Sequence, residues 1–191
     1  NTGGTSLTGD IYANPGDWIL ATVTTRSATT FPDDWTVLRE STVLDSNAYN
    51  QRMAFLCKQV TEEGQVDITI TQSESARIYI NLLTFSDIQG FAYHEGTEVY
   101  SNAGEKPVMV TRPGYDSLVW GCTTNLWHTT APHGLWLCDD LKAYCLDGDS
   151  TQPRQANFID DDPTVTEREF TPSPYSTGTP GYIIDCVEVL K

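Results

Sequence analysis

The chain has 191 residues, and 26 Asp and Glu against 11 Lys and Arg give a formal net charge of −15 at pH 7. A surface this negative repels nucleic-acid phosphates and anionic lipid head groups, which argues against nucleic-acid binding and membrane association through charge. Hydrophobic residues make up 39% of the chain and aromatic residues 10%, too many for a disordered acidic segment. We therefore expect a single folded domain over residues 1–191, with no run of 18 apolar residues that would insert into a membrane.

Alternation of apolar and polar residues with a period of two recurs along the chain and predicts β-strands. The predicted strands cover residues 18–24, 35–43, 52–60, 66–71, 76–85, 107–111, 117–124, 134–138, 155–159, 166–171 and 182–190. In the strand at 52–60 one set of alternate side chains is Met53, Phe55 and Cys57, and the other is Ala54, Leu56 and Lys58. About ten to twelve short strands separated by turns predict an all-β fold, an antiparallel β-sandwich of jelly-roll type.

The two halves of the chain show weak sequence similarity to each other. Residues 15–25 align, at an offset of 99, with a segment that ends at residue 124. Weaker matches pair the residues near 52 with those near 154, and the residues near 79 with those near 182. Two related halves, 10–90 and 107–191, would give a sandwich with pseudo-twofold symmetry. Generic β-strand sequences produce much of the same pattern, so duplication and chance both remain open. In either case we expect both halves to share one core, because no long linker separates them.

The sequence contains five cysteines. They are Cys57, Cys122, Cys138, Cys145 and Cys186. Their number is odd, so at least one is free or pairs between chains. Three lie in apolar strand-like contexts, which favours buried thiols acting as small hydrophobic groups. The absence of a Cys-x-x-Cys pair in the sequence gives a redox motif or a zinc ribbon no support.

A search for catalytic motifs favours a protein that is not an enzyme. The sequence has no phosphate-binding loop, dinucleotide glycine pattern, nucleophile elbow or His-Glu-x-x-His motif. Neighbouring carboxylates, as in glycosidases, occur at 62–63, 139–140, 147–149 and 160–162. Each group lies in a predicted turn, where Asp is favoured by its local hydrogen bonds to the backbone. We therefore interpret these acids as solvated turn residues.

Two of these acidic segments are candidates for a structural calcium ion. Asp147 and Asp149 lie within one short segment, and Asp160 and Asp162 lie within another. Closely spaced carboxylate oxygens are ligands that calcium prefers. Neither segment has the glycine and the glutamate of a helix-flanked calcium loop. No other cofactor is expected.

The connection between residues 125 and 136 is the candidate ligand-binding loop. It contains Trp127, His128, His133 and Trp136 together with Pro and Gly. Aromatic faces stack on the C–H faces of sugar rings, and His edges hydrogen-bond to hydroxyls, so the loop could bind a glycan. Two alternatives remain: Trp136 is a core residue that corresponds to Trp35, and Trp127 anchors a protein contact.

Packing and turn motifs along nearly the whole chain resemble β-sandwich modules of phage virion proteins. The resemblance lies in the run from Pro15 to Val23, in Pro32 followed by Trp35, and in a strand that ends near Phe85 with Gly90 after it. It implies a stable extracellular or virion β-domain, of the kind found in capsid decoration and tail fibres. Such modules offer no catalytic residues to carry over, and the five cysteines depart from their usual composition.

Two functions therefore follow as hypotheses. The first is a non-enzymatic structural or adhesion module of a virus particle, which decorates the capsid or forms part of a fibre. Its expected partners are virion proteins or a host-surface glycan, and a homo-oligomer is compatible with this role. The alternative is a carbohydrate-binding or glycan-degrading domain of a secreted bacterial protein. Saccharide binding that Trp127→Ala abolishes would favour the alternative or a fibre tip.

Overall fold

Strands make up the regular structure of the chain. The computed structural model describes residues 2–44, 50–94, 99–101, 108–110, 118–125, 136–147, 155–172 and 182–191. Over these ranges there are sixteen strands and no helix. Two antiparallel sheets of six strands each dominate them. The predicted all-β, sandwich-like class is confirmed. Within the same ranges no helix is long and apolar enough to span a membrane.

The first sheet has the order β1-β6-β2-β5-β4, with β3 beside β6. Its strands are β1 (Thr2–Ala13), β2 (Trp18–Thr25), β3 (Thr29–Thr30), β4 (Thr36–Leu44), β5 (Asn50–Gln59) and β6 (Gly64–Phe85). The second sheet has the order β12-β13-β10-β16-β7, with β8 beside β16. Its strands are β7 (Gly90–Ala92), β8 (Val99–Ser101), β10 (Leu118–Asn125), β12 (Lys142–Asp147), β13 (Gln155–Asp160) and β16 (Tyr182–Leu190). Two small pairs join β9 (Val108–Val110) to β14 (Glu167–Glu169) and β11 (Trp136–Leu137) to β15 (Thr171–Pro172).

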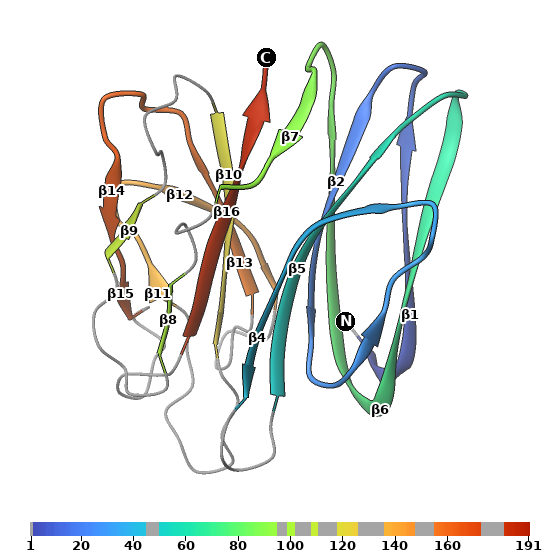
Figure 1. Cartoon of the computed structure of the whole chain (residues 1–191), viewed down its shortest axis with the longest axis horizontal. Coiled ribbons are helices and arrows are strands. Elements are labelled where there is room, and N and C mark those ends of the chain that lie inside the picture. The colour runs from blue at the N-terminus through green and yellow to red at the C-terminus, as the bar shows by residue number, and fades with distance from the viewer. Residues whose placement is uncertain are drawn as a thin grey trace.

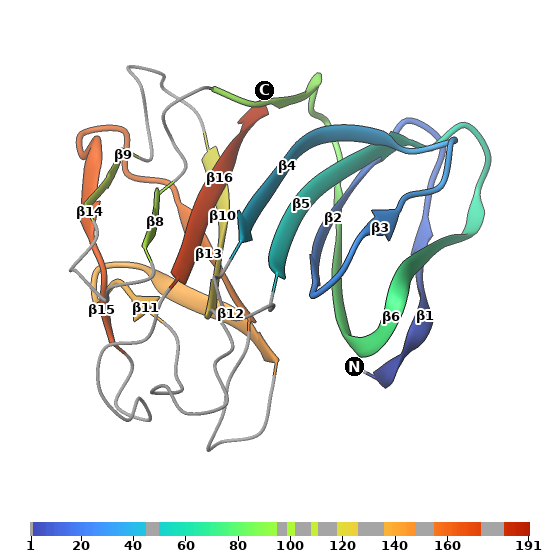
Figure 2. The same ribbon diagram turned by 60° about the horizontal axis from the view of Figure 1, so that its bottom comes forward.

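The strands stack in layers (Figure 1). At one end, β1 and the first part of β6 form an outer layer, and the rest of the first sheet lies inside it. The second sheet follows, and the two small strand pairs lie on its far side. Figure 2 shows β4 and β5 beside β10 and β16, where the two large sheets meet.

Three clusters of buried apolar side chains fill the spaces between these layers. We call the cluster inside the first half the first core, the cluster between the two large sheets the central core, and the cluster on the far side of the second sheet the second core. Strand β5 has a face in two of them: Phe55 and its alternate neighbours lie in the central core, and Ala54 and Leu56 lie in the first core. This confirms the alternation predicted for residues 52–60. Because β5 is buried on both faces, the first core lies on one side of it and the central core on the other.

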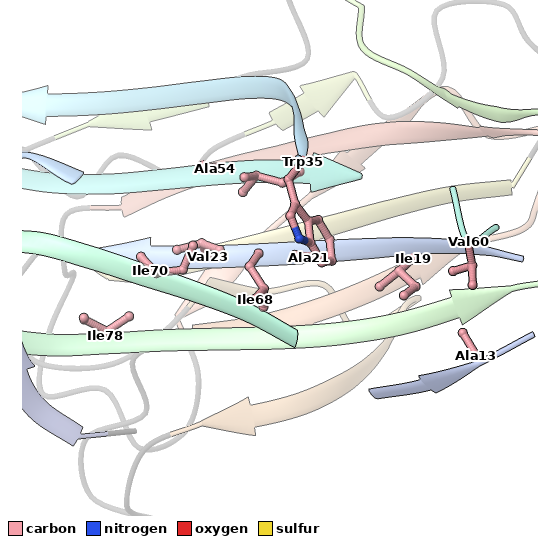
Figure 3. Packing of buried hydrophobic residues seen from close by; sticks show 11 residues of the cluster. Ala13, Ile19, Ala21, Val23, Trp35, Ala54, Val60, Ile68, Ile70 and Ile78 are labelled. Carbon is pink, nitrogen blue, oxygen red and sulfur yellow. The ribbon is translucent and has the colours of Figure 1, made fainter. Parts of the chain in front are cut away.

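The first core gathers side chains from the outer layer and from β2, β5 and the turn that precedes β4 (Figure 3). Trp35 is 5% exposed, and Ile68 and Ile70 of β6 are almost fully buried. Strand β1 packs Leu7 and Ile11 against this core. The apolar alternation does not predict β1, because the glycines and threonines of this strand weaken it.

Strand β6 is one strand of 22 residues, where the sequence predicts two, at 66–71 and 76–85. The register with β1 is interrupted between Gly4 and Ser6, which face Ala76 and Thr71, and this bulge bends the strand. Gln72 lies buried in the bulge, and its Nε2 donates to the carbonyl oxygens of Gly4 at 2.8 Å and Ala76 at 2.7 Å. A polar residue inside the predicted gap therefore holds the bend together.

The two halves share one strand order. The run β6-β2-β5-β4 in the first sheet corresponds to β16-β10-β13-β12 in the second, and corresponding strands follow one another in the same order along the chain. Leu20 of β2 and Trp120 of β10 both lie in the central core, so equivalent faces of the two sheets pack together. Matching these faces requires an even offset between β2 and β10. The offset of 99 from the sequence alignment would place the opposite face of the strand in the central core.

A hydrogen-bonded turn at Asn14–Asp17 precedes β2. The Asp17 carboxylate accepts from the backbone N of Asn14 at 2.9 Å and from Ser86 Oγ at 2.7 Å. These hydrogen bonds lower the pKa of Asp17 below its ordinary value, the bond from the Asn14 backbone most of all. The Asp17 carbonyl also accepts from Val60 N at 2.8 Å, so the turn ties the start of β2 to the end of β5.

Candidate functional site

The predicted aromatic ligand site falls largely outside the described residues. Trp127, His128 and His133 lie outside the described residues. Trp136 begins β11, and its backbone pairs with Pro172 of β15. Glycan binding by these four residues stays a prediction.

The two segments predicted as alternative calcium sites lie apart, because Asp147 and Asp160 are at opposite ends of β13. Asp147 pairs with Gln155 at one end of β13, and Asp160 ends the same strand five residues later. At about 3.4 Å per residue the two positions lie about 17 Å apart, so one ion cannot contact both. Asp149 lies outside the described residues. Asp160 and Asp162 do lie together, at the edge of a pocket.

This pocket has a volume of about 620 Å³ and lies where β13 ends, against β14. We call it the Arg168 pocket, and it is lined by Asp140, Leu141, Ile159, Asp160, Asp161, Asp162, Val165 and Arg168. Two turns frame it: Leu141 N donates to the Cys138 carbonyl at 3.1 Å before β12, and Val165 N donates to the Asp162 carbonyl at 3.4 Å after β13. Pairing of Lys142 in β12 with Ile159 in β13 brings the two turns together.

A buried ion pair forms the most enclosed part of the Arg168 pocket. Arg168 Nε donates to Asp160 Oδ2 at 2.9 Å, and Nη2 donates to Oδ1 at 2.8 Å. The Asp160 side chain is fully buried, and that of Arg168 is 7% exposed. The hydrogen bonds to Asp160 raise the pKa of Arg168 above its ordinary value. The two-point contact fixes the guanidinium plane, because a fork of two parallel donors matches one carboxylate.

The third guanidinium nitrogen is oriented differently. Arg168 Nη1 lies 3.9 Å from Asp140 Oδ2, which is beyond hydrogen-bond distance. Among the described residues no acceptor forms a hydrogen bond with Nη1. Asp140 is itself 79% exposed, so water reaches this side of the pocket.

The carboxylate of Asp162 is held by the turn that carries it. Its Oδ1 accepts from Thr164 N at 2.9 Å and from Thr164 Oγ1 at 2.6 Å. These bonds lower the pKa of Asp162, the hydroxyl bond most. A carboxylate with a lowered pKa is ionised at neutral pH, so it is an acceptor and not a general acid. In the described residues no three His, Cys, Asp or Glu side chains converge closely enough to hold a metal ion.

Four of the cysteines are buried thiols. Cys57 and Cys122 lie in the central core, and Cys138 and Cys186 lie in the second core. Burial raises the pKa of Cys57 to about 11, and it raises the pKa of Cys122 and of Cys138. A thiol with a raised pKa is protonated at neutral pH and is a poor nucleophile.

A second polar cluster lies inside the central core, where it links the two sheets. Asp185 of β16 is fully buried and accepts from Ser41 Oγ of β4 at 3.3 Å. Arg39 Nε lies 4.0 Å from the same carboxylate. Trp120 Nε1 donates to Thr22 Oγ1 at 3.1 Å between the same two sheets. This cluster fixes how the sheets pack, and Asp185 and Trp120 have no exposed surface for a ligand.

Sequence reasoning found the acids of the Arg168 pocket but interpreted them as separate solvated turns. It missed Arg168, which is a single cation between Glu167 and Glu169 in a short strand. The available signal was its rarity: the chain has only 11 Lys and Arg.

The comparisons with known proteins add no identity to this geometry. No family model matches the sequence, and neither a curated protein nor a solved structure matches the chain. The function therefore has to be argued from the fold and the Arg168 pocket.

Proposed function

We propose that the chain is a non-enzymatic structural or adhesion module of a virus particle, either decorating the capsid or forming part of a fibre. The observation that carries the proposal is the stacking of layers around three closed cores. Both large sheets are covered on their central faces, so contacts with other molecules fall to outer faces, sheet edges and loops. A passive scaffold that presents such surfaces is what decoration and adhesion require.

The chemistry of the described side chains supports binding more than turnover. A glycosidase needs a carboxylic acid with a raised pKa beside a second carboxylate. In the Arg168 pocket, Asp160 is held in an ion pair and the pKa of Asp162 is lowered. The thiols of Cys57, Cys122 and Cys138 have raised pKa values and are protonated at neutral pH. We infer a protein that works by contact.

The acidic surface supports an extracellular or virion location and partners other than nucleic acid. Exposed acids on the outer face of the first half, such as Asp10 and Asp67, keep sheets of neighbouring molecules apart by repulsion. Partners are then selected at specific sites: virion proteins, a host-surface glycan or another copy of the chain.

Co-sedimentation tests this proposal. The purified chain is mixed with particles purified from its source and separated on a density gradient. Attachment at a fixed number of copies per particle supports the proposal. Turnover of any polysaccharide in a reducing-end assay would overturn the non-enzymatic role.

The Arg168 pocket favours one alternative, a carbohydrate-binding domain of a secreted bacterial protein. Saccharide binding without attachment to particles would support that alternative over a virion module.

A further inference from the structure

We propose that the Arg168 pocket binds a neutral or amino sugar, with hydroxyl groups held between Arg168 and the surrounding carboxylates. The inference deepens the proposed adhesion function and rests on it, because it assigns the glycan contact to a site away from the predicted aromatic loop. Arg168 has a buried guanidinium, and within the described residues its Nη1 forms no hydrogen bond.

The guanidinium of Arg168 supplies a directed donor. Its Nε and Nη2 are both occupied by Asp160, which leaves Nη1 facing the pocket residue Asp140 at 3.9 Å. The side chain of Arg168 is more than nine-tenths buried, so its position is fixed, and Nη1 faces the side of the pocket that water reaches. A ligand oxygen placed between Nη1 and Asp140 would accept from one and donate to the other. A hydroxyl group does both, whereas a metal ion or an ammonium group cannot accept.

The carboxylates supply acceptors around this donor. Asp140 and Asp161 are exposed, and Asp162 uses Oδ1 for Thr164. These three side chains lie along the pocket without converging on one point, as the absence of a metal-binding group among the described residues indicates. Spread acceptors match the spaced hydroxyls of a sugar ring better than they match a single ion.

The rest of the lining is aliphatic. Leu141, Ile159 and Val165 contribute apolar surface next to the polar groups. Sugar rings present apolar C–H faces together with hydroxyl edges, so a mixed lining is complementary to them. The volume of about 620 Å³ falls inside the range of small-ligand pockets.

Charge sets the selectivity. The pocket carries four aspartates and one arginine, which is a formal charge of −3. An anionic sugar, such as a uronic acid, is repelled by this field. A neutral sugar is accepted, and an amino sugar gains a favourable charge interaction. The order of affinity is therefore amino sugar, neutral sugar, acidic sugar.

The test measures binding of three trisaccharides to the full chain by calorimetry: glucosamine, N-acetylglucosamine and galacturonic acid. The D140N/D161N variant removes two pocket carboxylates that form no hydrogen bonds within the described residues. The matched control is D10N/D67N, which removes two carboxylates from the outer face of β1 and β6 and so changes the net charge equally. We expect D140N/D161N to weaken binding of the first two sugars about tenfold or more, because each hydrogen bond to a charged group contributes about a factor of ten. The control keeps wild-type affinity.

Methyl NMR localises the contact without relying on a variant. Shifts of the Leu141, Ile159 and Val165 methyl signals on addition of the N-acetylglucosamine trimer support the inference. Equal affinity for the acidic trisaccharide overturns it, as does equal weakening in the control. Methyl shifts with calcium chloride but not with sugars overturn it too. Binding that Trp127→Ala abolishes while D140N/D161N leaves it intact also overturns it, yet keeps the adhesion function. Attachment to particles without any sugar binding overturns the sugar-binding inference as well, and it too leaves the proposed adhesion function standing.

Discussion

Gly121 lies in β10 directly opposite Phe158 of β13, and the phenyl ring covers the glycine. A Cβ added at Gly121 would lie 2.0 Å from Cζ of that ring, whereas ordinary contacts begin near 3.4 Å. The ring would have to move by about 1.4 Å. It is 3% exposed and packs against Phe170 with 5.4 Å between the ring centroids, so the movement disturbs the second core.

We therefore expect Gly121→Ala to destabilise the protein. Overpacking of a core costs about 1–3 kcal/mol, and this contact is at the severe end. The lower entropy of the unfolded alanine chain offsets about 0.5 kcal/mol of that. The net loss is about 2–3 kcal/mol in the free energy of unfolding, or roughly 4–12 °C in Tm for a protein of this size. Urea unfolding and calorimetry measure both quantities.

Two variants check the reasoning. Gly4→Ala makes the same substitution in β1, where the nearest heavy atom to the added Cβ is the Ser6 carbonyl oxygen at 3.8 Å. It should change the free energy of unfolding by less than about 0.5 kcal/mol. Adding Phe158→Leu to Gly121→Ala should recover about 1 kcal/mol relative to the sum of the single changes. A wild-type Tm for Gly121→Ala, or strict additivity in the double variant, would refute the packing argument.

Three further predictions concern buried or hydrogen-bonded polar groups. Arg168→Ala leaves Asp160 buried without its partner, so we expect a loss of about 3–5 kcal/mol in urea unfolding, whereas Arg168→Met combined with Asp160→Leu loses much less. An equal loss in both would contradict this account of the ion pair. The Cys57 thiol, whose pKa is about 11, should not react with a disulfide reagent at pH 8 until the protein is unfolded in urea. Rapid labelling of the native protein at Cys57, identified by mass spectrometry, would disprove its burial. Because the pKa of folded Asp17 lies below its unfolded value of about 4, its stabilising effect is present above that pH and is lost as the pH falls through the folded pKa. Unfolding from pH 6 to pH 2 should therefore show a smaller loss of stability for Asp17→Asn than for the wild type, and parallel curves would contradict the lowered pKa.

Period-two alternation was enough to predict the central strands of both large sheets. Strand β5 shows why: both of its faces are buried, so each set of alternate residues reports one core. Strand β1 was missed because an edge strand with one exposed face tolerates threonine and glycine. The bend in β6 was interpreted as a break between two strands. Gln72 is polar, and the sequence does not tell that its amide is buried in a bulge.

The Arg168 pocket depends on contacts that alternation cannot specify. Asp140 and Asp161 come together because β12 pairs with β13, and the register of that pairing is a property of the folded sheet. Asp160 looked like its neighbours Asp161 and Asp162 in the sequence. Only Asp160 is buried, because it ends β13 on the side that faces Arg168. From sequence position alone, Asp160, Asp161 and Asp162 are three equivalent acidic residues in a turn.

The weak similarity between the halves suggested an alignment in the sequence, but it did not show which face of each strand is buried. The offset of 99 aligned the threonines that end the two strands. Packing requires an even offset, because Leu20 and Trp120 both lie in the central core. Side chains that face a common core therefore give a sharper alignment than residue identity at strand ends.

The proposed role in a virus particle is tested most directly by finding the protein in its source. An antibody against the chain is used to probe a density gradient that separates assembled particles from soluble protein in an infected culture. The account predicts that the chain bands with the particles at a fixed stoichiometry to a major virion protein. Recovery of the whole chain in the soluble fractions, with none at the particle density, would contradict it.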